Sequence, residues 1–245
     1  MSNTFTVFGL HRSGTNFTEE LITTNIHDVE IAKCWRGRNT KDGIWKHAWG
    51  IEDKPTSERR NGLKGDPEKA EMIGDSILSV YIHKHPYSWI QSVTRKKMDI
   101  AAAYPFLADD LDQEENVING LNILHLAQLY RDHTEYWLNK VETRKVFHIK
   151  YEDLISSSNR TKEIVRDVAN FFNKKLKSNE IEIPRQVNAS GKFDENKRAQ
   201  YKTYQIKTLT FEQIQRINSI LDPTHMKKQG YTFIETEQEY DAHKV

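Results

Sequence analysis

The chain has 245 residues, which is enough for one domain with a full hydrophobic core. Its 36 basic and 35 acidic residues leave a net charge of +1, which argues against a general nucleic-acid binder and requires any anion site to come from locally placed arginine and lysine. The single cysteine, Cys34, excludes an internal disulfide, and no apolar run reaches the ~18 residues of a membrane span. We therefore expect a soluble, cytoplasmic protein with neither a signal peptide nor a transmembrane segment.

Predicted strands and helices alternate along the chain. In chain order they are a strand at Phe5–Phe8, a helix at Thr15–Ile26, a short strand at Val29–Lys33, a strand at Ile77–Ile82, a helix from Pro86 to Lys97, a long helix from Val117 to about Val141, a strand at Lys145–Ile149, a helix at Thr161–Phe172 and a helix capped by Thr210 that ends at Leu221. This alternation predicts a three-layer α/β fold with a mainly parallel central sheet flanked by helices. The nearly unbroken apolar run at Phe5–Phe8 predicts a central strand buried on both faces.

The most informative segment is Phe5-Thr-Val-Phe-Gly-Leu-His-Arg-Ser-Gly-Thr-Asn-Phe17. A strand, a tight polar turn and a helix in this order aim backbone N–H groups and the positive end of the helix dipole at an anion. Arg12 adds a guanidinium that can bind phosphate or sulfonate bidentately. Further backbone and hydroxyl donors come from Ser13, Gly14, Thr15 and Asn16. No lysine follows Gly14, so the loop differs from the GxxxxGK[ST] loop of nucleotide triphosphatases, which argues against ATP.

Two further polar clusters follow predicted strands. Lys84 ends the second strong strand, and Ser92 lies two helical turns later, so both are candidates to bind one phosphate group. Tyr151-Glu-Asp-Leu154 follows the third strand. Because ligands bind at the carboxyl ends of the strands in open α/β sheets, we expect all three clusters at one edge of the sheet.

In these three motifs the chain resembles the sulfotransferase family that uses 3′-phosphoadenosine 5′-phosphosulfate. The first loop of that family reads basic-Ser-Gly-Thr-x-aromatic, which Arg12-Ser-Gly-Thr-Asn-Phe17 matches. Its second motif is a basic residue with a serine eight positions on, matched by Lys84 and Ser92, and its third includes a tyrosine, matched by Tyr151. The resemblance spans most of the chain and implies one sulfotransferase-like domain, residues 1–245, with a fold like that of P-loop NTPases.

The resemblance also implies a role for each matched residue. The loop from Arg12 to Phe17 would hold the 5′-phosphosulfate, with Arg12 at the transferred group and Phe17 packed on the adenine. Lys84 and Ser92 would bind the 3′-phosphate, and Tyr151 would approach the adenine. Family members usually have arginine where this chain has Lys84, and lysine binds phosphate as a point charge instead of a fork.

Sulfuryl transfer to a hydroxyl needs a proton acceptor, and histidine suits this role near neutral pH. The cytosolic branch of the family places a histidine shortly after a lysine, an arrangement that Trp45-Lys46-His47-Ala48-Trp49 resembles. We therefore expect His47 to be the base and Lys46 to neutralise charge on the bridging oxygen. A carboxylate, Glu19 or Glu20, is the alternative base, because some branches use one. Both glutamates also suit the first turns of a helix for electrostatic reasons alone.

The irregular segment Ile183–Tyr204 contains basic residues in the region where the family closes a loop over the 3′-phosphate. The candidates are Lys192, Lys197 and Arg198, although the Arg-Lys-Gly pattern of the cytosolic branch is absent. A solvated run of charges is the alternative interpretation. No cysteine–histidine cluster has the spacing of a zinc site, and we expect no metal.

The predicted function is in-line transfer of a sulfuryl group from 3′-phosphoadenosine 5′-phosphosulfate to a hydroxyl or amine, with adenosine 3′,5′-bisphosphate as the product. The alternatives are a P-loop-type nucleotide or sugar kinase and a non-catalytic nucleotide-binding module. Three charged and aromatic loops suit a polar acceptor such as a saccharide, and also an ordinary protein surface: Arg36–Gly43, Asp53–Lys69 and Ala101–Glu115. The sequence identifies neither the acceptor nor the oligomeric state.

Overall fold

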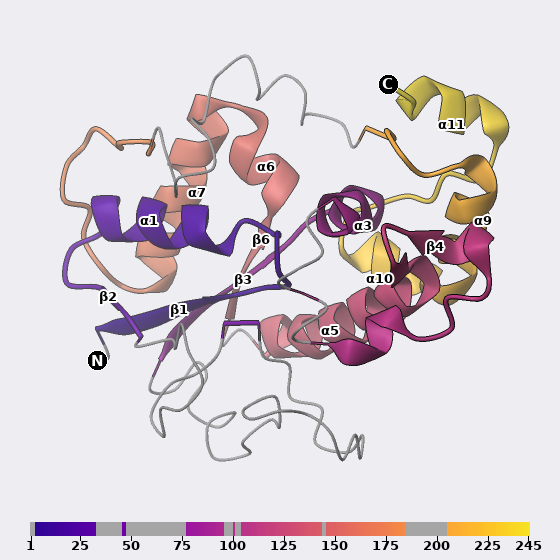
Figure 1. Ribbon diagram of the computed structural model, residues 1–245. Coiled ribbons are helices and arrows are strands. Elements are labelled where there is room, and N and C mark those ends of the chain that lie inside the picture. Colours follow the sequence, from indigo (N-terminus) through magenta and orange to yellow (C-terminus); the bar gives the residue numbers. More distant parts are fainter. Residues whose placement is uncertain are drawn as a thin grey trace. The chain divides into compact units, whose positions relative to one another are not determined.

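The structure is a computed structural model (Figure 1), and it describes residues 3–32, 46–47, 77–95, 100, 104–143, 146–184 and 205–245. The chain divides into two compact units. The first comprises Met1–His83 and Tyr136–Lys202, and the second comprises Lys84–Glu135 and Thr203–Val245.

The first unit is built on a four-stranded sheet in which all strands run parallel, in the order β2-β1-β3-β6. These strands are β1 (Thr4–Phe8), β2 (Glu30–Ile31), β3 (Leu78–His83) and β6 (Val146–Lys150). The prediction of an α/β fold with a parallel sheet is therefore confirmed. The central position of β1 is confirmed as well, because it pairs with a strand on each side and Phe5–Phe8 is buried.

One face of this sheet carries an aliphatic and aromatic core. Its side chains alternate along the strands, as the two-residue period of a strand requires, and include Val7, Val80 and Ile149. Helices α1 (Thr15–Asn25) and α7 (Ser158–Phe171) cover this face. The short helix α6 (Tyr151–Ser156) directly precedes α7, and the two are separated by Ser157, the N-cap of α7.

The opposite face of the sheet packs against the end of α5 (Ile123–Glu142). Phe8 stacks on Trp137 with ring centroids 4.2 Å apart, and Tyr81 lies 5.7 Å from the same indole. Val146 completes this smaller core. The sheet of the first unit is thus enclosed between helices in three layers, as the sequence predicts.

The second unit combines short helices with a two-stranded antiparallel hairpin. Its described elements are α3 (Pro86–Thr94), the 3₁₀ helices η1 (Pro105–Ala108) and η2 (Glu114–Asn116), β4 (Val117–Ile118), β5 (Leu121–Asn122), the first turns of α5, α9 (Phe211–Ile220), α10 (Pro223–Lys228) and α11 (Glu237–His243). The predicted cap of α9 is confirmed, since Thr210 and Gln213 form a reciprocal capping box.

The hairpin corrects one prediction. We expected a helix from Val117, but the chain turns back at Asn119 and Gly120, whose φ angles are +52° and +72°. Positive φ at both central residues defines the type I′ turn, for which Asn-Gly is a preferred pair. Helix α5 therefore begins only at Ile123, where the side chain of Asn122 accepts a hydrogen bond from the N–H of Leu124 at 2.9 Å.

Candidate functional site

The loop between β1 and α1 contains a tight turn at its centre. The N–H and the hydroxyl of Ser13 both donate to the carbonyl of Leu10, at 3.1 and 2.6 Å. Arg12, the third residue of this turn, has a φ of +69°, and Gly14 has a φ of +101°. The Ser13 hydroxyl is therefore used inside the loop, and the exposed Arg12 is held in a left-handed backbone conformation that non-glycine residues seldom adopt.

Both glycines of this loop lack space for a side chain. A Cβ atom at Gly9 would lie 2.4 Å from the carbonyl oxygen of Ile82 and 2.5 Å from the hydroxyl of Ser13. A Cβ atom at Gly14 would lie 2.6 Å from the ring of Tyr151. The first and third motifs of the sequence are therefore in contact, because the Tyr151 ring packs directly on the loop.

The N-terminus of α1 lacks two stabilising devices, a side-chain cap and an acidic residue in the first turn, at least one of which is present on most other described helices. Its N-cap is Gly14, which has no capping side chain, and its first turn holds no acidic residue. In the described part of the chain, α3 is the other α-helix with neither device. Side-chain caps are present on α5 (Asn122), α7 (Ser157), α9 (Thr210), α10 (Asp222) and α11 (Thr236), and α6 has two acidic residues in its first turn. An uncapped helix start leaves positive potential available for an anion.

Lys46 lies against the first turns of α1. Its ammonium donates to the side-chain carbonyl of Asn16 and to Glu19 Oε2, the latter at 3.0 Å. The side chains of Lys46 and Glu19 are only 20% and 11% exposed, so this ion pair is largely shielded from water. The predicted catalytic lysine and one of the two alternative carboxylates are thus direct partners.

His47 is attached to the loop through Gly9. Its Nδ1 lies 2.6 Å from the carbonyl oxygen of Gly9, and the N–H of Gly9 donates to the carbonyl of Lys46 at 3.0 Å. The ring of His47 also stacks on His11, with centroids 3.9 Å apart. The structure therefore brings Lys46 and His47 to the loop that contains Arg12.

Two predicted donor-binding aromatics take part in the core of the first unit. Phe17 is only 7% exposed and belongs to the core between the sheet, α1 and α7. Tyr151 is half-buried and packs against the same core. Thr15, the first residue of α1, is buried too. The adenine contacts predicted for Phe17 and Tyr151 remain predictions.

Lys84 and Ser92 belong to the second unit. Both are buried, and α3 begins at Pro86 between them. The backbone at Lys84 is held by Tyr130, whose hydroxyl donates to the Lys84 carbonyl at 2.8 Å and also binds the buried side chain of Gln229 at 2.8 Å. Their joint binding of a 3′-phosphate remains a prediction.

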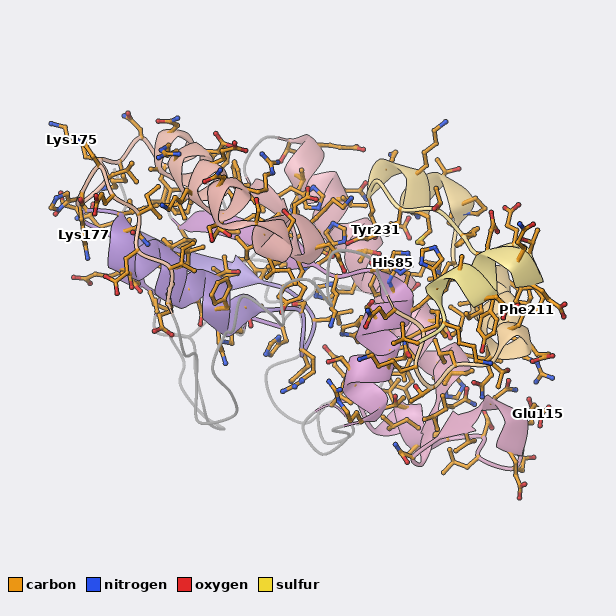
Figure 2. The ribbon with its side chains drawn as sticks, turned by 90° about the horizontal axis from the view of Figure 1, so that it is seen from above. His85, Glu115, Lys175, Lys177, Phe211 and Tyr231 are labelled. Atoms are coloured by element: carbon orange, nitrogen blue, oxygen red, sulfur yellow. The ribbon has the colours of Figure 1, made fainter. Side chains whose placement is uncertain are left out.

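His83 and His85 lie in different surroundings, one in each unit. In the second unit, the fully buried ring of His85 packs edge-on against Tyr231, with centroids 4.6 Å apart (Figure 2). In the first unit, His83 stacks on His148 at 4.6 Å, and both rings lie near Tyr81. We treat these contacts as structural because they are made within the packed cores.

Burial shifts the pKa values of His148 and Tyr81. The pKa of His148 is lowered from 6.5 to about 4, first because burial disfavours the imidazolium and then because Lys150 repels it, with Asp153 acting in the opposite direction. Burial raises the pKa of Tyr81 well above its usual value. His148 is therefore neutral at physiological pH in the folded protein.

Several predicted residues lie outside the described residues. They are Lys192, Lys197 and Arg198, together with Trp45, Ala48 and Trp49. Sequence reasoning also missed one neighbour of the site, His11, which stacks on His47. Its position directly before Arg12 was the available signal, but a contact across 36 residues leaves no local pattern.

Comparisons with protein-family models, with curated proteins and with solved structures found no match to this chain. Within the described residues, no helix is long and apolar enough to cross a membrane. The same residues contain no group of three or more histidine, cysteine, aspartate or glutamate side chains that could hold a metal ion.

Proposed function

We propose that the protein is a sulfotransferase that takes a sulfuryl group from 3′-phosphoadenosine 5′-phosphosulfate. One observation carries the proposal: Arg12, Lys46 and His47 gather at the uncapped N-terminus of α1, beside the carboxyl end of β1. An anion binds favourably at such a terminus, and the three side chains supply two fixed positive charges and a proton acceptor.

The proposed reaction is a single in-line displacement. An oxygen of the acceptor hydroxyl bonds to sulfur while the bond from sulfur to the bridging phosphate oxygen breaks. The hydroxyl proton passes to His47, and adenosine 3′,5′-bisphosphate leaves. Arg12 and Lys46 stabilise negative charge on the donor side, where the bridging oxygen becomes a phosphate oxygen.

The hydrogen bond of His47 makes it a suitable base. A carbonyl oxygen can only accept, so the contact with Gly9 requires Nδ1 to carry the proton. In the neutral ring Nε2 is then the nitrogen that can accept a proton, which is the role a general base needs. Glu19 is the weaker candidate, because protonating its carboxylate would remove the ion pair with Lys46.

The proposed ligands of the 3′-phosphate are Lys84 and Ser92. Lys84 is a buried lysine two residues before α3, the other described α-helix without a side-chain cap or an acidic first turn. Ser92 adds a hydroxyl on the same helix. Helix N-termini and lysine side chains are both common binders of phosphate.

Thermal unfolding with adenosine 3′,5′-bisphosphate, compared with ATP plus magnesium, tests the donor site. A specific ligand at about 100 times its dissociation constant adds roughly 2.7 kcal/mol, which raises the melting temperature of a chain of this size by about 5–10 °C. We expect a rise with the bisphosphate alone. A rise with ATP alone would move the assignment to a kinase, and no rise with either would contradict the proposal.

Transfer of labelled sulfuryl groups to a panel of hydroxyl and amine acceptors tests the chemistry. His47→Ala should lower the rate by ~10²–10⁴-fold while leaving bisphosphate affinity unchanged. Glu19→Gln is the companion variant for the alternative base. Near-normal transfer in His47→Ala would remove His47 from the mechanism. Tight bisphosphate binding without transfer to any acceptor would favour a non-catalytic binding module.

A further inference from the structure

His11 packs face to face on His47, the proposed base. The ring centroids are 3.9 Å apart and the ring planes differ by 23°, which is a stacked arrangement. Both residues are half-buried. The contact joins the segment before Arg12 to the segment that contains Lys46, so it lies inside the candidate site.

The backbone fixes both partners of this stack. Gly9 binds residues 46 and 47 from both of its peptide groups: its N–H donates to the Lys46 carbonyl and its carbonyl accepts from His47 Nδ1. On the other side of His11, the two hydrogen bonds from Ser13 to Leu10 close the turn that contains it. His11 is therefore held in place by hydrogen bonds of its neighbours, independently of its own ring.

The hydrogen bond and the stack constrain different properties of His47. The bond to Gly9 anchors one nitrogen and selects the tautomer, but the ring can still tilt about that anchor. A flat ring packed at 3.9 Å limits the tilt, because turning the imidazole out of plane would lose the contact or cause a clash. Together they define the direction of Nε2, the atom that accepts the proton in the proposed reaction.

We propose that His11 is a positioning residue that holds the imidazole of His47 in one orientation and so keeps its Nδ1–H on the carbonyl of Gly9. The inference rests on the proposed function for the role of His47, but the contact itself can be tested without any substrate. The flat ring of His11 performs this role, and its charge is not required. Phenylalanine at position 11 should therefore replace it, whereas alanine should not.

Long-range proton–nitrogen NMR spectra of the histidine rings, recorded at pH 8 on the full chain, test this inference. The His47 signals are assigned by their loss in His47→Asn. We expect one set of signals with a protonated Nδ1 in the wild type and in His11→Phe, and averaged or doubled signals in His11→Ala. His27→Ala, which removes an exposed histidine of the same unit, is the control and should leave the His47 signals unchanged.

Three results would overturn the inference. They are a wild-type His47 protonated on Nε2, a single unaltered Nδ1–H signal in His11→Ala, and loss of that signal in His11→Phe. If His11→Ala does not fold, His11→Leu provides the same comparison, because it also lacks a flat ring. Binding of adenosine 3′,5′-bisphosphate is measured in parallel: its absence in the wild type would contradict the proposed function and leave the NMR result to decide the role of His11.

Discussion

Two strand-to-helix junctions meet at the carboxyl edge of the sheet, and they are built in opposite ways. Between β1 and α1, six residues intervene, two of them have positive φ, and the helix starts without a cap or an acidic residue. Between β6 and α6 no residue intervenes: Lys150 is extended, with φ −84° and ψ 129°, and Glu152 and Asp153 occupy the first turn of the helix.

The two junctions differ in the charge that they place at the start of the helix. Carboxylates in the first turn of α6 interact favourably with the positive end of its dipole, so residues of the junction itself balance that charge. The first junction has two residues with positive φ and a helix start without carboxylates, and Tyr151 from the second junction packs on it at Gly14. The second junction thus acts as the support of the first.

Replacing Gly14 by alanine breaks the contact between the junctions. The φ of +101° disfavours any Cβ atom, and that atom would also lie 2.6 Å from the Tyr151 ring. We expect a loss of about 3 kcal/mol in the free energy of unfolding, measured by urea denaturation, together with loss of bisphosphate binding. Ala32→Gly, a substitution outside both junctions, is the control for binding. Wild-type stability in Gly14→Ala would show that the loop has room that the structure does not indicate.

Replacing His148 by phenylalanine tests the second junction, where Lys150 and Asp153 act on this ring. Because the pKa of His148 is about 4 when folded and 6.5 in its ordinary state, the unfolded chain binds the proton more readily between these values. This contribution to stability is present at pH 7 and declines by about 3 kcal/mol as the pH falls to 4.

We therefore expect His148→Phe to lose less stability than the wild type between pH 7 and pH 4, by that amount, in urea unfolding at each pH. All other titratable groups are shared, so the difference between the two proteins isolates His148. Equal losses of stability would show that His148 ionises in the folded protein as readily as in the unfolded chain.

Replacing Asn16 by aspartate makes the first junction resemble the second. The new carboxylate, at the second position of α1, should stabilise the helix by about 0.5 kcal/mol and yet weaken bisphosphate binding at least about tenfold, because it repels the ligand from the helix start. Gln238→Glu makes the same chemical change at the second position of the capped helix α11. It should leave binding unchanged. Equal effects of both substitutions on affinity would contradict an anion site at α1.

Replacing Arg12 by glycine and by alanine separates strain from binding. Both substitutions remove the guanidinium and should weaken bisphosphate binding. Glycine tolerates the φ of +69°, so Arg12→Gly should be more stable than Arg12→Ala by about 1 kcal/mol, which corresponds to a melting temperature higher by about 2–4 °C. Equal melting temperatures would indicate that the turn relaxes without cost.

The fold prediction was correct where the sequence pattern depends on neighbouring residues. The apolar run of β1 and the cap at Thr210 depend on residues within a few positions, and both were confirmed. The start of α5 was wrong because helical periodicity outweighed Asn119-Gly120, a two-residue signal for a hairpin. Helix α7 begins three residues earlier than predicted because Ser157, not a later residue, caps it.

The candidate site was predictable only in part. The loop at Arg12 is encoded in consecutive residues, so its position between β1 and α1 followed from the sequence. The pairs Gly14–Tyr151 and His11–His47 join residues that are distant along the chain, and only the folded backbone brings them together. The ion pair of Glu19 with Lys46 likewise joins residues that are distant along the chain, and no sequence pattern indicated it.

Helix α5 has a consequence for how the protein melts. The division between the two units falls inside this helix, between Glu135 and Tyr136, and another crossing lies directly at the end of β3. Tyr130 is buried in one unit and Trp137 in the other, about two turns apart in the same continuous helix. Unfolding of either unit would unwind part of α5, and the other unit needs this helix for its own core. Heating should therefore produce one cooperative transition instead of two separate ones.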